Sequence, residues 1–140
     1  MLKTFSITDI GRKRKVNQDF VYSSERFVGP LPNLFLVADG MGGHNAGDYA
    51  SRLAVETIVE RSSGSLETNP LRVLDEAVQS ANGLVRKRAQ ETPELQGMGT
   101  TVVAAVIDGR ELYVANVGDS RLYIVNSGEI RQITKDHSWV

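Results

Sequence analysis

The N-terminal third of the chain shows the hydrophobic pattern of β-structure. The run from Leu34 to Ala38 is continuously apolar and is cut off by Asp39-Gly40, which is typical of a short strand buried on both faces. Two further β-rich segments precede it, Thr4 to Asp9 and Phe20 to Ser23, and turn-forming residues bound each of them. Three strands are therefore predicted before residue 42.

The pattern becomes helical after Gly43. Small and apolar side chains recur at i, i+4, i+7 and i+8 spacing, at Ala46, Ala50, Leu53, Ala54, Thr57 and Ile58. Gly64 is a suitable stop signal for this helix. A second helix is predicted from Asn69 as the N-cap and Pro70 in the first turn, and Pro93 ends it. Its apolar stripe comprises Leu71, Leu74, Val78, Ala81 and Val85.

Four short β-rich runs follow, "GTTVVAAVI", "RELYVANV", "SRLYIV" and "EIRQIT". Turn signals at Asp108-Gly109, Gly118 to Ser120 and Asn126 to Gly128 separate them and predict an antiparallel meander. Strands, then helices, then strands without βαβ alternation indicate an α+β protein whose sheet packs against another sheet and against helices. A single domain is expected for 140 residues that are 41% hydrophobic.

Composition narrows the classes of partner. Sixteen basic and seventeen acidic residues leave a formal charge of -1, so no global field favours nucleic acid or an anionic membrane surface. The chain has no cysteine, which excludes disulfides and thiolate ligands and suits a reducing compartment. Neither the apolar core of a signal peptide nor a membrane-spanning run is evident. We expect a soluble, cytoplasmic protein with no nucleic-acid and no membrane partner.

Three acids lie at the edges of predicted strands. Asp19 begins one strand, Asp39 ends another, and Asp119 occupies a hairpin corner. Because the chain lacks cysteine and has only two histidines, His44 and His137, such carboxylates predict an oxygen-rich site suited to Mg²⁺ or Mn²⁺ rather than Zn²⁺.

The same residues are also ordinary turn formers. Gly40 permits a turn whose carbonyl points at a metal, but Asp-Gly pairs occur in turns without any such role. We interpret Asp108-Gly109 as a plain turn. An apolar strand and a glycine-rich turn flank Asp39, yet the pattern alone leaves both interpretations of Asp39 open.

Several motifs occur in order along almost the whole chain. They are "GRKRKVNQD" from Gly11, "VADGMGGHNAG" from Val37, "MGTT" from Met98, "ANVGDSRLY" from Ala115 and "ITKDHS" from Ile133. With these motifs the chain resembles the N-terminal part of a PP2C-type (PPM family) metal-dependent protein serine/threonine phosphatase of the bacterial branch. The resemblance implies an αββα sandwich of two antiparallel sheets flanked by helices. Residues 1–140 are expected to be one such domain, truncated at its C-terminal side.

The resemblance also implies roles for the acids. Asp39 matches the carboxylate that bridges two Mn²⁺ or Mg²⁺ ions, and Gly40 matches a main-chain oxygen ligand of one ion. Asp19 matches an acid at the metal cluster, bound directly or through a coordinated water. Asp119 matches an acid tied to a third, weaker metal site in bacterial members.

Arg14 matches the arginine that holds the substrate phosphate. A planar, permanently charged guanidinium suits that contact. A run of basic residues is more often a solvated surface, which is how we interpret Arg12, Lys13 and Lys15. Among these basic residues, only Arg14 occupies the position of the family's motif arginine.

The resemblance does not define which residue acts as the general acid that protonates the leaving oxygen. Some relatives outside the bacterial branch have histidine directly after the Asp-Gly pair, where this chain has Met41. His44 is a candidate to protonate the leaving oxygen, directly or through water. A surface or helix N-terminal role for His44 is equally open.

The implied activity is hydrolysis of phosphoserine and phosphothreonine in proteins. The implied partners are substrates of a bacterial serine/threonine kinase, which the family typically opposes. Two cations roughly 3.5–4 Å apart activate a water for in-line attack on phosphorus. The family's two C-terminal aspartate blocks are absent from this sequence. Residues 1–140 alone are therefore expected to have little or no activity and to self-associate. The alternative is a non-catalytic PP2C-like binding or regulatory module.

Overall fold

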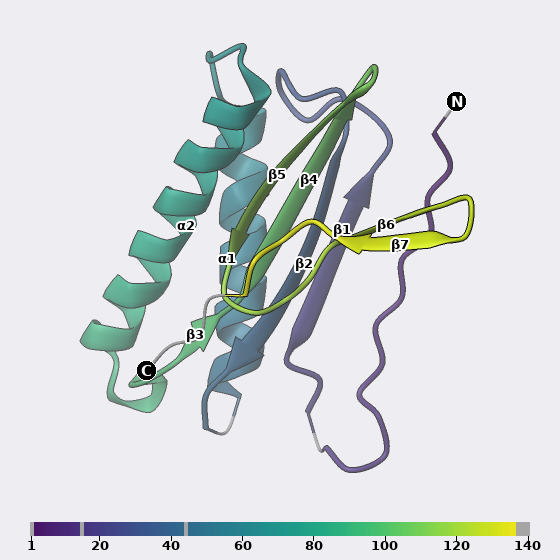
Figure 1. The fold of residues 1–140 in the computed structure, drawn as a ribbon. Helices are drawn as coiled ribbons and strands as arrows, with labels where there is room; N and C mark the ends of the chain where they lie inside the picture. The colour runs from purple at the N-terminus through teal and green to yellow at the C-terminus, as the bar shows by residue number, and fades with distance from the viewer. Residues whose placement is uncertain (1, 15, 44, 137–140) are drawn as a thin grey trace.

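The computed structural model describes residues 2–14, 16–43 and 45–136. Two long helices, α1 and α2, lie side by side on one face of a five-stranded antiparallel sheet (Figure 1). A separate two-stranded sheet, formed by β6 and β7, lies on the other side. The elements in chain order are β1 (Asp19–Ser24), β2 (Leu34–Met41), α1 (Ala46–Ser63), α2 (Pro70–Glu91), the short 3₁₀ helix η1 (Pro93–Leu95), β3 (Gly99–Thr100), β4 (Val102–Asp108), β5 (Glu111–Val117), β6 (Tyr123–Asn126) and β7 (Glu129–Gln132).

The strand order brings the start of β1, the end of β2 and the end of β5 to one end of the main sheet. The order is β1-β2-β4-β5, and β3 pairs with β2 beyond β4. All neighbours are antiparallel, so the start of β1 lies beside the end of β2. For the same reason the end of β5 lies beside the start of β4. Asp19 is the first residue of β1, Asp39 lies near the end of β2, and Asp119 follows β5.

Both predicted helices are confirmed, with their end signals. The Gly64 N–H donates to the Glu60 carbonyl at 3.1 Å and ends α1. The Asn69 side chain accepts a hydrogen bond from the Leu71 N–H at 3.0 Å and caps α2. The predicted apolar stripe of α2 is wrong at Leu71, which is 50% exposed. Val73 is buried instead, because the first turn of the helix carries Leu71 away from the sheet.

The core lies between the helices and one face of the sheet. Along β2 the buried side chains alternate with more exposed ones, so the prediction of a strand buried on both faces is wrong. Val37 is 48% exposed, because the helices cover only the opposite face of β2. The fully buried core side chains include Leu31, Leu34, Leu36, Ile58, Leu74 and Val106.

The predicted strand at Thr4 to Asp9 is also wrong. Residues 2–10 form no strand within the described part of the chain, and Phe5 and Ile7 are 85% and 73% exposed. A strand requires a neighbouring backbone for its hydrogen bonds, and the described residues supply none here. The segment runs on the same side of the main sheet as the β6–β7 hairpin (Figure 1).

The predicted meander is two hairpins rather than one continuous sheet. β4 pairs with β5, and β6 pairs with β7, but β5 and β6 belong to different sheets. The chain leaves the main sheet at Gly118, whose φ of +94° suits glycine. Asp119 therefore lies in a corner between two sheets instead of inside a hairpin. Among the described helices, none is long and apolar enough to cross a membrane.

Candidate metal centre

Asp19 and Asp39 face each other at the open end of the sheet. They are partners in the β1–β2 register. The next pair along is hydrogen-bonded, since the Gly40 N–H donates to the Gln18 carbonyl at 3.0 Å. Asp19 and Asp39 thus form the non-hydrogen-bonded type of antiparallel pair, in which side chains approach most closely. Their two carboxyl groups are close enough for Asp19 to raise the pKa of Asp39.

Several charged groups lie near Asp39 and shift its pKa. Partial burial of its carboxyl group raises the pKa of Asp39, and the hydrogen bond and negative charge of Asp19 raise it further. The guanidinium of Arg14 lowers that pKa, while the Asp119 carboxylate raises it. Asp19, Asp119 and Arg14, which come from three separate parts of the fold's strand ends and turns, therefore all lie within range of the Asp39 charge.

Gly40 has no room for a side chain. A Cβ on Gly40 would lie 1.9 Å from the Gly47 carbonyl oxygen and 2.9 Å from that of Gln18. The Gln18 amide also donates to the Gly42 carbonyl at 2.9 Å. The end of β2 is thus pressed against the first turn of α1. This packing alone requires glycine, so the carbonyl-ligand role of Gly40 stays a prediction.

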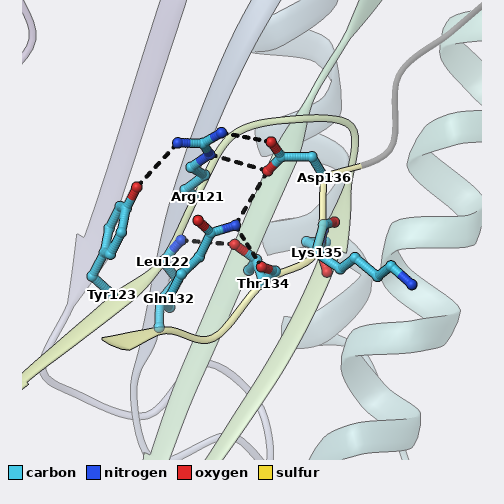
Figure 2. Close-up of polar contacts among 8 residues, drawn as sticks. Arg121, Leu122, Tyr123, Gln132, Thr134, Lys135 and Asp136 are labelled. Carbon is cyan, nitrogen blue, oxygen red and sulfur yellow. Dashed lines mark hydrogen bonds and ion pairs between the residues drawn. The ribbon is translucent and has the colours of Figure 1, made fainter. Parts of the chain in front are cut away.

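A polar network anchors the chain directly after Asp119. The Arg121 guanidinium makes a two-pronged ion pair with Asp136, at 2.7 and 3.1 Å. It also donates to the Tyr123 hydroxyl at 3.3 Å, as Figure 2 shows. Gln132 donates to the Thr134 carbonyl at 2.8 Å and to Asp136 at 3.3 Å. The segment after β7 is therefore tied back to the corner that carries Asp119.

Sequence reasoning missed this network. Arg121 lies in the motif "VGDSR" and Asp136 in the motif "KDHS", and neither motif predicts that the two side chains pair. An opposite charge pair separated by 15 residues carries no periodic signal, so only the fold reveals it.

The two predicted catalytic residues have different outcomes. Arg14 is exposed directly after the turn formed by residues 11–13, and its charge reaches Asp39. Arg12 and Lys13 are exposed in the same turn. His44 lies outside the described residues, as does Lys15.

The donor set fits part of the shell of a hard divalent cation. Every converging donor is a carboxylate oxygen, the ligand type that Mg²⁺ and Mn²⁺ prefer. A cation would relieve the like-charge crowding that raises the pKa of Asp39. Within residues 2–14, 16–43 and 45–136, however, no three acidic or histidine side chains gather closely enough to hold a metal ion. The acids therefore offer an incomplete set of ligands.

A cavity of about 510 Å³ lies elsewhere, between α2 and the strand ends. Its lining is mainly apolar, with Met41, Val78, Val85, Met98 and Val117 among the lining residues. None of the three candidate acids lines it. We assign the site to the converging acids, because charge and not an apolar cavity would recruit a cation.

Comparison with known proteins decides the family. Residues 12–139 match the profile of the family Protein phosphatase 2C. The chain belongs to the PP2C family. The resemblance inferred from the motifs is thereby confirmed.

The PP2C relatives are bacterial serine/threonine phosphatases. The serine/threonine protein phosphatase PstP of Mycobacterium tuberculosis is 36% identical over 140 residues, which are 100% of this chain and 26% of PstP. The serine/threonine phosphatase stp of Listeria welshimeri is 39% identical over 142 aligned positions, covering 95% of this chain and 54% of the relative. The chain thus spans about a quarter and about half the length of these two proteins.

A solved PP2C structure confirms the fold. The catalytic domain of PstP in complex with two manganese ions superposes with a TM-score of 0.79 and 38% identity, over 91% of this chain and 53% of that one. The predicted α+β architecture of antiparallel sheets and helices is confirmed. That PstP structure holds two manganese ions, while the metal ligands in the present chain remain predicted.

Proposed function

We propose that the chain is the N-terminal part of the catalytic domain of a metal-dependent protein serine/threonine phosphatase. The observation that carries the proposal is the convergence of Asp19, Asp39 and Asp119 with Arg14 at one end of the sheet. Membership of the PP2C family supports it. Its substrates are phosphoserine and phosphothreonine in proteins, supplied by a bacterial serine/threonine kinase.

Each residue has a proposed part. Asp39 and the Gly40 carbonyl would hold a pair of Mn²⁺ or Mg²⁺ ions, with Asp19 bound to them directly or through water. Asp119 would hold a third ion. When bound, such ions supply a water of lowered pKa and offset charge on the phosphoryl oxygens.

Arg14 and His44 have proposed parts that need no metal. Arg14 holds the substrate phosphate through its guanidinium fork. His44 donates a proton to the leaving oxygen, directly or through water.

Substitution of Asp39 tests the proposal. In a protein extended to the full length of the PP2C domain, Asp39→Asn should remove nearly all Mn²⁺-dependent hydrolysis of a small phosphate ester while circular dichroism stays unchanged. Asp108→Asn is the matched control, because Asp108 also follows an apolar run and precedes a glycine but lies in the β4–β5 turn. Turnover of Asp39→Asn within a few-fold of the unaltered protein would contradict the assignment.

A second candidate function applies to the present chain by itself. The described residues lack a cluster of three metal-binding side chains, which favours a binding or regulatory module over an active enzyme. A chain without turnover that still binds a phosphopeptide would support this alternative.

We also propose that the chain self-associates through the side of the main sheet that the helices leave only partly covered. The exposed apolar side chains there include Phe5, Ile7, Val37, Val125 and Ile130. Light scattering should show a mass above 15.3 kDa that rises with concentration. A concentration-independent monomer would overturn this.

A further inference from the structure

Thr101 stands opposite Asp39 in the sheet but pairs with it in an unusual way. β2 keeps one register along β3 and β4, which makes Asp39 and Thr101 ladder partners. The Thr101 N–H donates to the Asp39 carbonyl at 2.9 Å, as in a regular ladder. The Asp39 N–H, however, donates to the Thr101 hydroxyl oxygen, Oγ1, at 3.0 Å. The Thr101 carbonyl accepts instead from the Thr100 hydroxyl at 2.8 Å.

The replacement of the Thr101 carbonyl by the Thr101 hydroxyl as hydrogen-bond acceptor explains the break between β3 and β4. The sequence predicts one continuous β-rich run from Gly99 to Ile107, yet the structure interrupts it at Thr101. A side-chain hydroxyl takes the place of a ladder carbonyl at the level of Asp39. Thr101 thereby binds both backbone groups of that aspartate.

The same side chain reaches the corner that carries Asp119. Thr101 Oγ1 lies 2.5 Å from Ser120 Oγ. A hydroxyl has one proton and two lone pairs, so Thr101 can serve Asp39 and Ser120 together. On the other side, a Cβ on Gly118 would lie 2.7 Å from the Thr101 methyl group. Thr101 is 3% exposed and contacts the corner on both sides of Asp119.

We infer that Thr101 is a positioning residue that holds the Asp119 corner against the Asp39 end of β2 and so sets the placement of both carboxylates. The inference rests on the proposed function, which gives that placement its purpose. Thr101 ligates no ion and touches no substrate in this role. It acts through the Asp39 backbone and through Ser120.

Four variants of the present chain separate positioning from ordinary burial. Thr101→Val removes the hydroxyl and keeps the branched shape, while Thr101→Ser keeps the hydroxyl. Ser120→Ala removes only the bond to the corner. Thr57→Val is the matched control, because Thr57 is a buried threonine whose hydroxyl donates to the Leu53 carbonyl within α1 at 2.6 Å.

Two measurements by nuclear magnetic resonance provide the readouts. In the metal-free chain, hydrogen exchange of the Asp39 amide should accelerate about tenfold or more in Thr101→Val and remain slow in Thr101→Ser, Ser120→Ala and Thr57→Val. The Asp119 amide resonance should move in Thr101→Val and Ser120→Ala but not in Thr57→Val. Titration with Mg²⁺ alone should show an affinity about tenfold weaker in Thr101→Val and Ser120→Ala, the scale of losses for residues that orient ligands.

An unchanged Asp39 exchange rate together with an unmoved Asp119 resonance in Thr101→Val would overturn the inference. If Thr101→Val does not fold, Ser120→Ala decides, because an unmoved Asp119 resonance in that variant overturns the link to the corner. If the unaltered chain shows no response to Mg²⁺, the present chain binds no ion by itself, and the Asp39→Asn test in the extended protein decides the metal part of the proposed function. The exchange and resonance data still decide the role of Thr101 in that case.

Discussion

Asp39 and Asp108 have similar sequence neighbours but different surroundings. Each follows an apolar run and precedes a glycine. Asp108 pairs with Glu111 at the β4–β5 turn, whereas Asp39 lies against Asp19 at the other end of the sheet. The crowding of carboxylates, and not the residue type, distinguishes the candidate site from a plain turn.

The raised pKa of Asp39 leads to a prediction about pH. An acid with a higher pKa in the folded chain stabilises the fold below its unfolded value of about 3.9, and this contribution is lost as the pH rises through the raised value. At pH 7 in chelator, the charged Asp39 therefore destabilises the fold. We expect Asp39→Asn to raise the free energy of unfolding in urea at pH 7, with little difference at pH 3. Asp108→Asn should change neither value, and a destabilised Asp39→Asn at pH 7 would refute the account.

A second prediction at this scale concerns two glycines of the "DGMGG" turn. Gly40→Ala should destabilise the chain by about 3 kcal/mol or more, because its Cβ would collide with the backbone of Gly47. Gly43→Ala should stay within about 0.5 kcal/mol, since nothing lies within 4 Å of a Cβ there. Urea denaturation of both variants checks this, and equal losses would show that α1 does not press on β2 as described.

At the level of elements, the two helices differ in how their N-termini are satisfied. α2 has an asparagine cap whose side chain accepts a hydrogen bond, together with a proline in its first turn. α1 also begins after an asparagine, Asn45, but in the described structure that side chain makes no capping hydrogen bond. The same residue type therefore has different energetic weight at the two helix starts.

Alanine substitution at the two asparagines measures this difference. Asn69→Ala should lower the free energy of unfolding by about 1 kcal/mol, because the Leu71 N–H loses its acceptor. Asn45→Ala should change it by less than about 0.5 kcal/mol. Thermal and urea denaturation in chelator provide the values. A larger loss at Asn45 than at Asn69 would contradict the capping assignments.

At the scale of the whole molecule, the arrangement is asymmetric. The helices cover one face of the main sheet, and a short hairpin with the N-terminal segment only partly covers the other (Figure 1). The acids gather at one end of this sheet without a third close metal-binding side chain among the residues described. Packing and ligand count thus both indicate a partial site.

Metal titration tests that conclusion. A hard divalent ion takes about six oxygen ligands, and several of them must be charged for tight binding. We expect the present chain to bind at most one Mn²⁺, with a Kd of about 0.1 mM or weaker, and to show only trace hydrolysis of a small phosphate ester. Calorimetry beside a phosphatase assay measures both. Two tight sites with full turnover would mean that other residues, or a second copy of the chain, complete the shell.

Much of the local structure was predictable from the sequence alone. Hydrophobic periodicity predicted both helices, and Gly64, Asn69 and Pro93 predicted their limits, because helix-ending signals act through hydrogen bonds a few residues away. The ordered motifs were sufficient to identify the PP2C resemblance. Turn residues likewise predicted the β4–β5 and β6–β7 hairpins.

Only the tertiary structure decided the relations between distant segments. Whether Thr4 to Asp9 form a strand depends on a neighbouring backbone. Whether Val37 is buried depends on which face of β2 the helices occupy. The pairing of Asp19 with Asp39, the ion pair of Arg121 with Asp136 and the insertion of the Thr101 hydroxyl into the ladder all join residues brought together by strand order. Local sequence determines which elements form, whereas burial, charge and hydrogen bonding at the site depend on contacts across the fold.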